Sequence, residues 1–181
     1  MKPTHYINLT AIGESPMEIV NRLMAVLHGI ARQHKLDYAT AFPNIRIGER
    51  AHPGSVIRVF GEHGSLEKFY SELLNHSFVK DYVRVNAIEA VPANVTSWTQ
   101  YRLYRIPNRK SRTTHTRQNR INDAVNLPYL RVASRSNGHA YSLRIQPVKV
   151  TEATDTCEPN SYGLAVSTRP FSLPDIPFAT G

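Results

Sequence analysis

The order of strand-like and helix-like segments over residues 1–92 most constrains what this chain can fold into. Segments that alternate apolar and polar residues predict strands, and apolar residues that recur every three or four positions predict helices. These patterns predict strand, helix, strand, strand, helix and strand at 5–12, 16–34, 36–48, 55–61, 65–79 and 81–91. This order is typical of the ferredoxin-like pattern and predicts an α+β domain.

Local signals predict where the first helix begins and which face it buries. Ser15 is favoured immediately before a helix, Pro16 fits the first helical position, and Glu18 completes a capping box. The helix should run to about His34, and its apolar stripe consists of Ile19, Leu23, Leu27 and Ile30. In the second helix we expect Ser65 at the N-cap and an inward face of Leu66, Phe69, Leu73 and Leu74.

His28 lies at the rim of the first helix's stripe, about 120° from the centre when residues are spaced 3.6 per turn. A side chain there is half covered by the protein and still able to reach a ligand. A structural role is the default for any single histidine, so the residues alone leave the role of His28 open.

The second half of the chain predicts a smaller α/β domain over residues 93–181, after a linker at 91–97. Its elements are a strand, a helix and two further strands, expected at 98–106, about 108–122, 127–134 and 139–150. The last two strands flank the segment "SRSNG" at 134–138, where Asn137 and Gly138 permit a tight turn. Local sequence alone favours an ordinary hairpin there.

Positive charge is concentrated in one third of the chain. The net charge is +8, and residues 90–151 contain eleven Lys or Arg but a single acid, Asp123. Such a concentration attracts polyanions, with nucleic acid as the first candidate and an anionic membrane as the second.

The helix predicted at about 108–122 contains five of these eleven basic residues and almost no apolar stripe. A helix without a stripe is seldom stable by burial alone, so we expect a partner to order it. A solvated surface helix would carry acids for i,i+4 pairing, and residues 105–120 have none. Arginine also predominates over lysine there, which suits phosphate contact and favours RNA as the partner. The apolar face is too small for a membrane-surface helix.

Several other classes are disfavoured. The lone Cys157 excludes an internal disulfide and a cysteine zinc site, which fits a cytoplasmic location. No segment approaches the roughly 20 apolar residues that span a bilayer, so we expect no membrane association. The eight histidines show no metal-like spacing, and we expect no metal and no cofactor.

Together these segments resemble the CRISPR repeat-cleaving endoribonucleases, specifically the small subtype I-F (Csy-type) branch. The similarity extends over nearly the whole chain. Its most specific part is the block "LPYLRVASRSNGHAYSLRIQ" at 127–146, and "YGL" at 162–164 matches a further element.

The resemblance implies a function. Members bind the hairpin of a CRISPR repeat transcript and cut at its 3′ base without metal. The upstream 2′-hydroxyl attacks the phosphate and leaves a 2′,3′-cyclic phosphate, and the enzyme stays on the hairpin with the other subunits of a surveillance complex. The alternative is a non-catalytic subunit that binds hairpin RNA in a ribonucleoprotein.

The resemblance also implies catalytic roles for three residues. A histidine acts as general base or positions the proton, which corresponds to His28 in "LHG". In the best-known pattern that histidine lies one turn further along, where this chain has Arg32. Ser134 matches the serine that constrains the attacking ribose, and Tyr162 matches the tyrosine that orients the histidine.

RNA-binding positions carry over mainly as a group. Arg102 corresponds to a strand arginine that reads a guanine, and Tyr104 stands where members often have glutamine. The full set of expected RNA-binding residues is Arg102, Tyr104, Arg105, Arg109, Lys110, Arg112, His115, Arg117, Arg120, Arg135 and Ser136.

Overall fold

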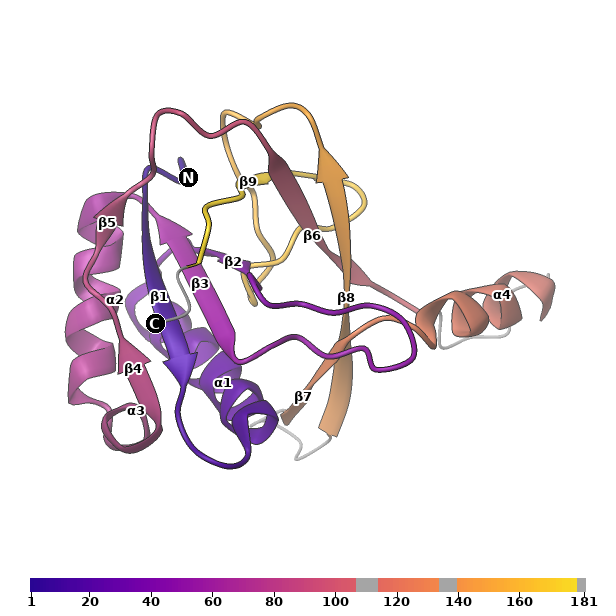
Figure 1. The fold of residues 1–181 in the computed structure, drawn as a ribbon, viewed down its shortest axis with the longest axis horizontal. Coiled ribbons are helices and arrows are strands. Elements are labelled where there is room, and N and C mark those ends of the chain that lie inside the picture. Colours follow the sequence, from indigo (N-terminus) through magenta and orange to yellow (C-terminus); the bar gives the residue numbers. More distant parts are fainter. Residues whose placement is uncertain (107–113, 134–139, 179–181) are drawn as a thin grey trace.

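The structure is a computed structural model that describes residues 1–106, 114–133 and 140–178 (Figure 1). The described residues form four helices and two antiparallel sheets. The predicted α+β class is therefore confirmed. The division into domains at 92 and 93 stays a prediction.

The first sheet has the spatial order β2-β3-β1-β4, with a short β5 also paired to β1. Its strands are β1 (His5–Ala11), β2 (Ala39–Ala41), β3 (Val56–Gly61), β4 (Val83–Val85) and β5 (Glu89–Ala90). In the central antiparallel pair, Tyr6 lies opposite Phe60 and Asn8 opposite Arg58. The order of elements along the chain is the predicted one, and its ferredoxin-like character stays our interpretation.

Two helices, α1 (Pro16–His34) and α2 (His63–Asn75), pack against β1 and against each other. The predicted stripe of α1 is buried, and the helix ends at His34 as expected. Lys35 follows it in the left-handed region at φ 52°. Ser15 is the N-cap residue, but its side chain makes no capping hydrogen bond, so the predicted capping box was wrong.

The second predicted helix is two helices. It begins at His63 rather than after Ser65 and stops at His76, whose backbone is extended at φ −82° and ψ 120°. Residues beyond it form the separate helix α3 (Ser77–Tyr82). Leu74 was expected to face inward, but its side chain is 43% exposed because it lies one position beyond the buried stripe that ends at Leu73.

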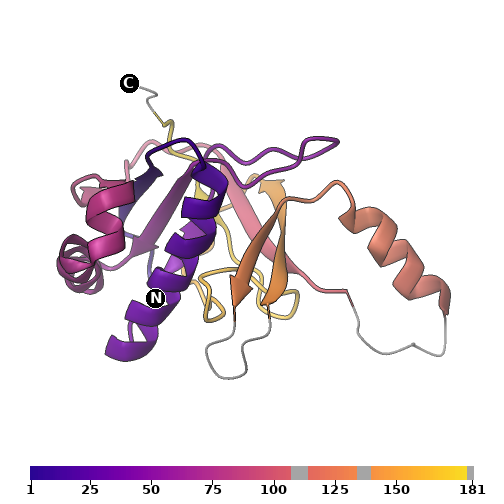
Figure 2. The same ribbon diagram turned by 90° about the horizontal axis from the view of Figure 1, so that it is seen from below.

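The second sheet has the order β7-β8-β6-β9. Its strands are β6 (Trp98–Tyr104), β7 (Tyr129–Ala133), β8 (Ala140–Val150) and β9 (Leu173–Pro174). The helix α4 (Thr114–Ala124) projects away from both sheets (Figures 1 and 2). The expected basic helix is thus present over its C-terminal part.

The two sheets share one continuous core. Buried apolar residues of the first half and of the second half belong to the same cluster. Backbone groups join the halves as well, since the Thr40 N–H donates to the Gly163 carbonyl at 2.8 Å and the Gly48 N–H to the Asn126 carbonyl at 2.9 Å. Neither half buries its apolar surface alone.

The face of the first sheet that carries Arg58 is covered by the end of the chain. Arg58 is only 2% exposed. Its Nε donates to Asn8 Oδ1 at 2.7 Å and its Nη1 to the Ile176 carbonyl at 2.6 Å. Arg58 therefore serves packing in this fold.

Candidate active site and nucleic-acid interface

His28 projects from α1 toward the loop between β8 and β9, and its ring is half-buried. The Nδ1 atom lies 2.7 Å from the carbonyl oxygen of Ser161. A carbonyl can only accept a hydrogen bond, so Nδ1 carries the proton and donates. The other ring nitrogen, Nε2, is then free to accept or deliver a proton.

Tyr162 lies flat against this imidazole. The two ring centroids are 4.5 Å apart and the planes differ by 21°. The Tyr162 hydroxyl is hydrogen-bonded to the hydroxyl of Tyr141 on β8. Burial, and then this hydrogen bond, raise the pKa of Tyr162. The phenol therefore stays protonated near neutrality, with its ring stacked on the imidazole of His28.

The loop that bears Tyr162 is closed by Asn160 and Gly163. Asn160 Oδ1 accepts from the backbone N–H groups of Tyr162 at 2.9 Å and of Leu164 at 3.1 Å. Gly163 has a positive φ of 75°, and a Cβ there would lie 2.9 Å from the backbone nitrogen of Thr40. The glycine of "YGL" is thus required by the backbone and by the close approach of β2.

Residues of the first half clamp the same loop. The Tyr38 hydroxyl donates to the Ser161 carbonyl at 3.1 Å, so this carbonyl receives both Tyr38 and His28. Burial raises the pKa of Tyr38 and keeps it a donor. Thr40 Oγ1 donates to the Tyr162 carbonyl at 3.1 Å. Tyr38, Thr40 and Asn160 are not predictable from the sequence, because no local pattern marks them.

Two adjoining pockets lie beside this pair. One of about 600 Å³ includes Tyr141 and Tyr162 in its lining. The other, of about 610 Å³, is lined by Arg102, Arg120 and Arg169 among others. The residues common to both linings are Leu103, Tyr104, Arg105 and Asn160. The arginine-rich surface and the His28–Tyr162 pair are therefore neighbours.

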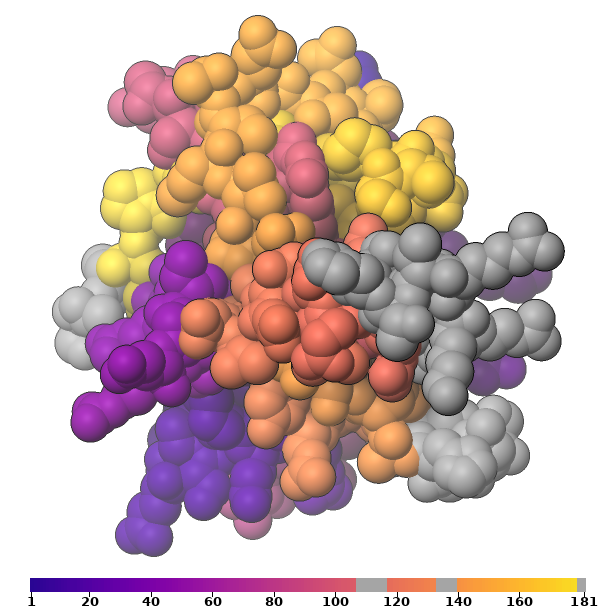
Figure 3. Space-filling view, turned by 90° about the vertical axis from the view of Figure 1, so that its right-hand side faces the viewer, coloured from indigo at the N-terminus to yellow at the C-terminus, as the bar shows by residue number. Residues whose placement is uncertain are grey.

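The end of α4 is tied to the second sheet at these pockets. Tyr104 donates to Asp123 Oδ2 at 3.3 Å, and the Arg120 guanidinium lies over the Tyr104 ring, 5.5 Å from its centroid. Arg144 Nη1 donates to the carbonyl of Ala124, the last residue of the helix, at 2.6 Å. Figure 3 looks onto this end of the molecule, where α4 lies near the centre of the face. Protein contacts thus hold the helix at its C-terminal end.

Arg102 is held in place before any ligand arrives. Its Nε donates to Gln100 Oε1 at 2.7 Å, and its Nη2 donates to the same oxygen. Gln100 is two residues back on β6, so both side chains lie on one face of the strand. This pairing restricts the guanidinium at the edge of the pocket.

A comparison with protein families decides the identity of this fold. The family described as CRISPR-associated protein (Cas_Csy4) matches residues 6–174. The chain belongs to the Cas_Csy4 family. This is the Csy4 family of CRISPR-associated endoribonucleases of subtype I-F, which confirms the resemblance seen in the sequence. No curated protein matches the chain.

Membership in the Cas_Csy4 family implies processing of CRISPR transcripts, binding of repeat RNA and nuclease activity. Within the described residues, His28 and Tyr162 are in contact, and Arg102, Tyr104, Arg105 and Arg120 line one surface. Arg117 is exposed on α4. The part of the chain that the structure describes has no helix long and apolar enough to cross a membrane.

The other predicted site residues of this Cas_Csy4 chain lie outside the described residues. These are Ser134, Arg135 and Ser136 after β7, and Arg109, Lys110 and Arg112 before α4. His115 lies within α4, and its side chain is not described. The strands that flank the serine segment are placed, since Ala133 pairs with Ala140 and the Arg131 N–H donates to Asn21 Oδ1 of α1 at 2.9 Å. The β7 strand therefore runs alongside the helix that carries His28.

Proposed function

We propose that this protein cleaves the repeat hairpins of CRISPR transcripts by a metal-independent reaction and keeps the hairpin bound afterwards. One observation carries the proposal: Tyr104, Arg105 and Asn160 line both the arginine-rich pocket and the pocket beside Tyr162. A hairpin held by the arginines would therefore have its backbone next to the His28–Tyr162 pair.

In the proposed reaction, the ribose 2′-hydroxyl upstream of the cut attacks the adjacent phosphorus. The bond from phosphorus to the 5′-oxygen breaks, which leaves a 2′,3′-cyclic phosphate and a 5′-hydroxyl. The 2′-hydroxyl loses a proton and the departing oxygen gains one. His28 Nε2 is suited to take or give that proton, because Nδ1 already donates to the Ser161 carbonyl.

Two further residues have supporting roles in this proposal. Tyr162 holds the imidazole by stacking, and its own hydroxyl is engaged by Tyr141. Ser134 is proposed to restrain the attacking ribose. It directly follows β7, which lies against the helix that carries His28.

Binding is assigned to the basic surface. Arg102 comes from β6 and Arg105 directly follows it, and Arg117 and Arg120 come from α4. Arginine forms paired hydrogen bonds with phosphate oxygens and with guanine edges, so these side chains suit both binding of the RNA backbone and recognition of bases. The preceding segment adds Arg109, Lys110, Arg112 and His115, and the serine turn adds Arg135 and Ser136. After cleavage, we propose that the bound hairpin joins the other subunits of a surveillance complex.

Single-turnover cleavage of the cognate repeat hairpin in EDTA, with analysis of the product ends, tests the proposal. We expect a cyclic phosphate from the unaltered protein and a large loss of rate in His28→Ala and in Ser134→Ala. Cleavage at the rate of the unaltered protein in both variants would refute the roles proposed for His28 and Ser134. A protein that binds the hairpin tightly but never cuts it would instead be a binding subunit.

A further inference from the structure

A groove of about 500 Å³ lies at the end of the molecule remote from α4. It is formed by the turn after β1, the start of α1 and the helix α3. Its lining is Ile12, Gly13, Glu14, Ser15, Glu18, Ile19, Arg22, Phe78 and Tyr82. A volume of this size is typical of pockets that bind ligands. No residue of the proposed active site contributes to it.

The groove exposes large apolar side chains that the fold does not bury. Ile12 is 45% exposed and Tyr82 is 46% exposed. They are neighbours, because the Ile12 N–H donates to the Tyr82 carbonyl at 2.8 Å. The ring of Tyr82 lies 5.5 Å from that of Phe78, and the Arg22 guanidinium lies over Phe78 at 4.3 Å. Contiguous exposed apolar side chains of this kind mark sites of protein interaction.

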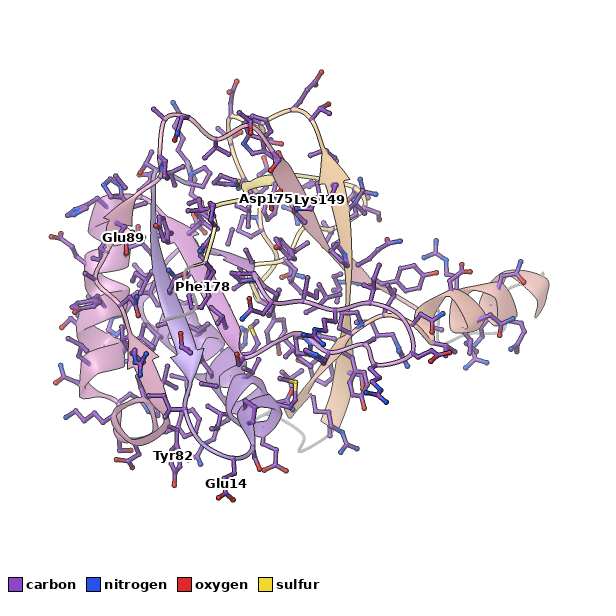
Figure 4. All side chains as sticks on the ribbon, in the orientation of Figure 1. Glu14, Tyr82, Glu89, Lys149, Asp175 and Phe178 are labelled. Carbon is purple, nitrogen blue, oxygen red and sulfur yellow. The ribbon has the colours of Figure 1, made fainter. Side chains whose placement is uncertain are left out.

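The charges beside this apolar surface are mainly negative. Glu14 and Glu18 are both exposed, and no ion pair among the described residues engages either carboxylate. Figure 4 shows Glu14 and Tyr82 at the same end of the molecule, with α4 at a different end. Two free carboxylates repel a phosphate backbone, so this groove is unsuited to the RNA that the basic surface attracts.

We propose that this groove docks a segment of another protein that carries an aliphatic or aromatic anchor beside lysine or arginine. The anchor would fill the space between Ile12 and Tyr82, and its basic neighbours would meet Glu14 and Glu18. Charge complementarity selects this occupant over RNA. The proposal does not depend on cleavage, because the groove shares no residue with the proposed catalytic pair.

Three blocked peptides test the chemistry: acetyl-Lys-Leu-Phe-Lys-amide, its charge-reversed form with Glu for Lys, and a form with Ser for Leu and Phe. Each is titrated into the ¹⁵N-labelled full chain bound to its repeat hairpin, and amide shifts are followed by NMR. The basic apolar peptide should shift Gly13, Ser15 and Arg22 saturably. The other two peptides should bind at least about tenfold more weakly.

Matched variants locate the site. Ile12→Asp should weaken the basic apolar peptide by at least about tenfold, whereas Leu74→Asp should leave it unchanged. The two leucine-sized side chains are equally accessible, at 45% and 43%, but Leu74 lies on α2 outside the groove. Hairpin binding and cleavage should be unaltered in both variants, which separates this proposal from the proposed function.

Four results would overturn the proposal. They are the absence of a saturable shift at the groove, equal binding of the charge-reversed peptide, displacement of the peptide when excess hairpin RNA is added, and equal effects of Ile12→Asp and Leu74→Asp. Sedimentation of the isolated protein adds a fifth. A dimer that Ile12→Asp dissociates would show that a second copy fills the groove.

Discussion

The imidazole of His28 and the phenol of Tyr162 stack across the junction of the two halves of the chain, with centroids 4.5 Å apart. The histidine comes from α1 and the tyrosine from the loop between β8 and β9. The same loop supplies the Ser161 carbonyl that fixes the proton on His28 Nδ1. One loop thus contacts the face of the ring and determines which of its nitrogens carries the proton.

The stack predicts that the ring of Tyr162 matters more than its hydroxyl. Tyr162→Ala removes the surface on which His28 rests, and a misplaced general base costs about 100-fold in rate. Tyr162→Phe keeps the ring and loses only the bond to Tyr141, so its loss should be much smaller. Single-turnover cleavage at saturating enzyme measures both. Equal losses in the two variants would contradict the stacking role.

Gly163→Ala should destabilise the whole protein. The residue has φ 75°, and the added Cβ would lie 2.9 Å from backbone and side-chain atoms of Thr40. The left-handed backbone alone costs roughly 1–2 kcal/mol for alanine, and the clash adds to it. Urea unfolding would measure the change. Gly64→Ala is the control, because nothing lies within 4 Å of its Cβ and it sits in a helix, where alanine is preferred.

Replacing Arg112 and Arg117 with Ala should weaken hairpin binding. Each lost phosphate contact should lower the slope of affinity against salt by about one. The rate at saturating enzyme should change much less, because these residues are proposed to grip rather than to react. Filter binding at several salt concentrations and single-turnover cleavage separate the two effects. Lys68→Ala, on α2, is the control. A large loss of the rate at saturating enzyme with binding intact would contradict the proposal that Arg112 and Arg117 bind the RNA without taking part in the reaction.

Alkaline pH should destabilise the fold in part through Tyr101. Burial raises the pKa of Tyr101 to about 12, above the ordinary value of 10.0. The raised pKa means that the folded state favours the protonated phenol. Its contribution is complete below pH 10 and is lost as the pH rises through 12, at a cost of about 2–3 kcal/mol.

The urea midpoint of the unaltered protein should therefore decrease as the pH is raised from 9 to 11. The midpoint of Tyr101→Phe should decrease less over the same interval. Tyr129→Phe removes the hydroxyl of a 46% exposed ring, so its urea midpoint should decrease as much as that of the unaltered protein. The same loss of stability in all three proteins would contradict the assignment to Tyr101.

Long periodic segments were predictable and short-range breaks were not. The stripe of α1 from Ile19 to Ile30 extends over several turns, so its type and its end at His34 followed from the sequence. The stop at His76 depends on one residue with extended backbone inside an apparently continuous helical pattern. No propensity marks that residue, and Leu74 was misplaced with it.

The two members of the proposed catalytic pair, His28 and Tyr162, are predicted from the sequence because "LHG" and "YGL" resemble family motifs. The hydrogen bonds that hold the Tyr162 loop in place were not predictable. The Tyr38 hydroxyl donates to the Ser161 carbonyl, 123 positions along the chain, and the Thr40 hydroxyl donates to the Tyr162 carbonyl, 122 positions along. Such bonds exist only once the halves have packed, so no window of sequence contains them.

The shared core and the late loop have a consequence for synthesis. The ribosome makes α1 before the loop that contacts His28, which lies between β8 and β9 of the second sheet. A nascent or truncated chain that stops before Asn160 would contain the basic helix but lack the loop that completes the pair. Such a chain would also lack Asn160 and Arg169, which line the arginine-rich pocket. The order of the elements therefore delays assembly of the proposed site until residues 160–164 have been made.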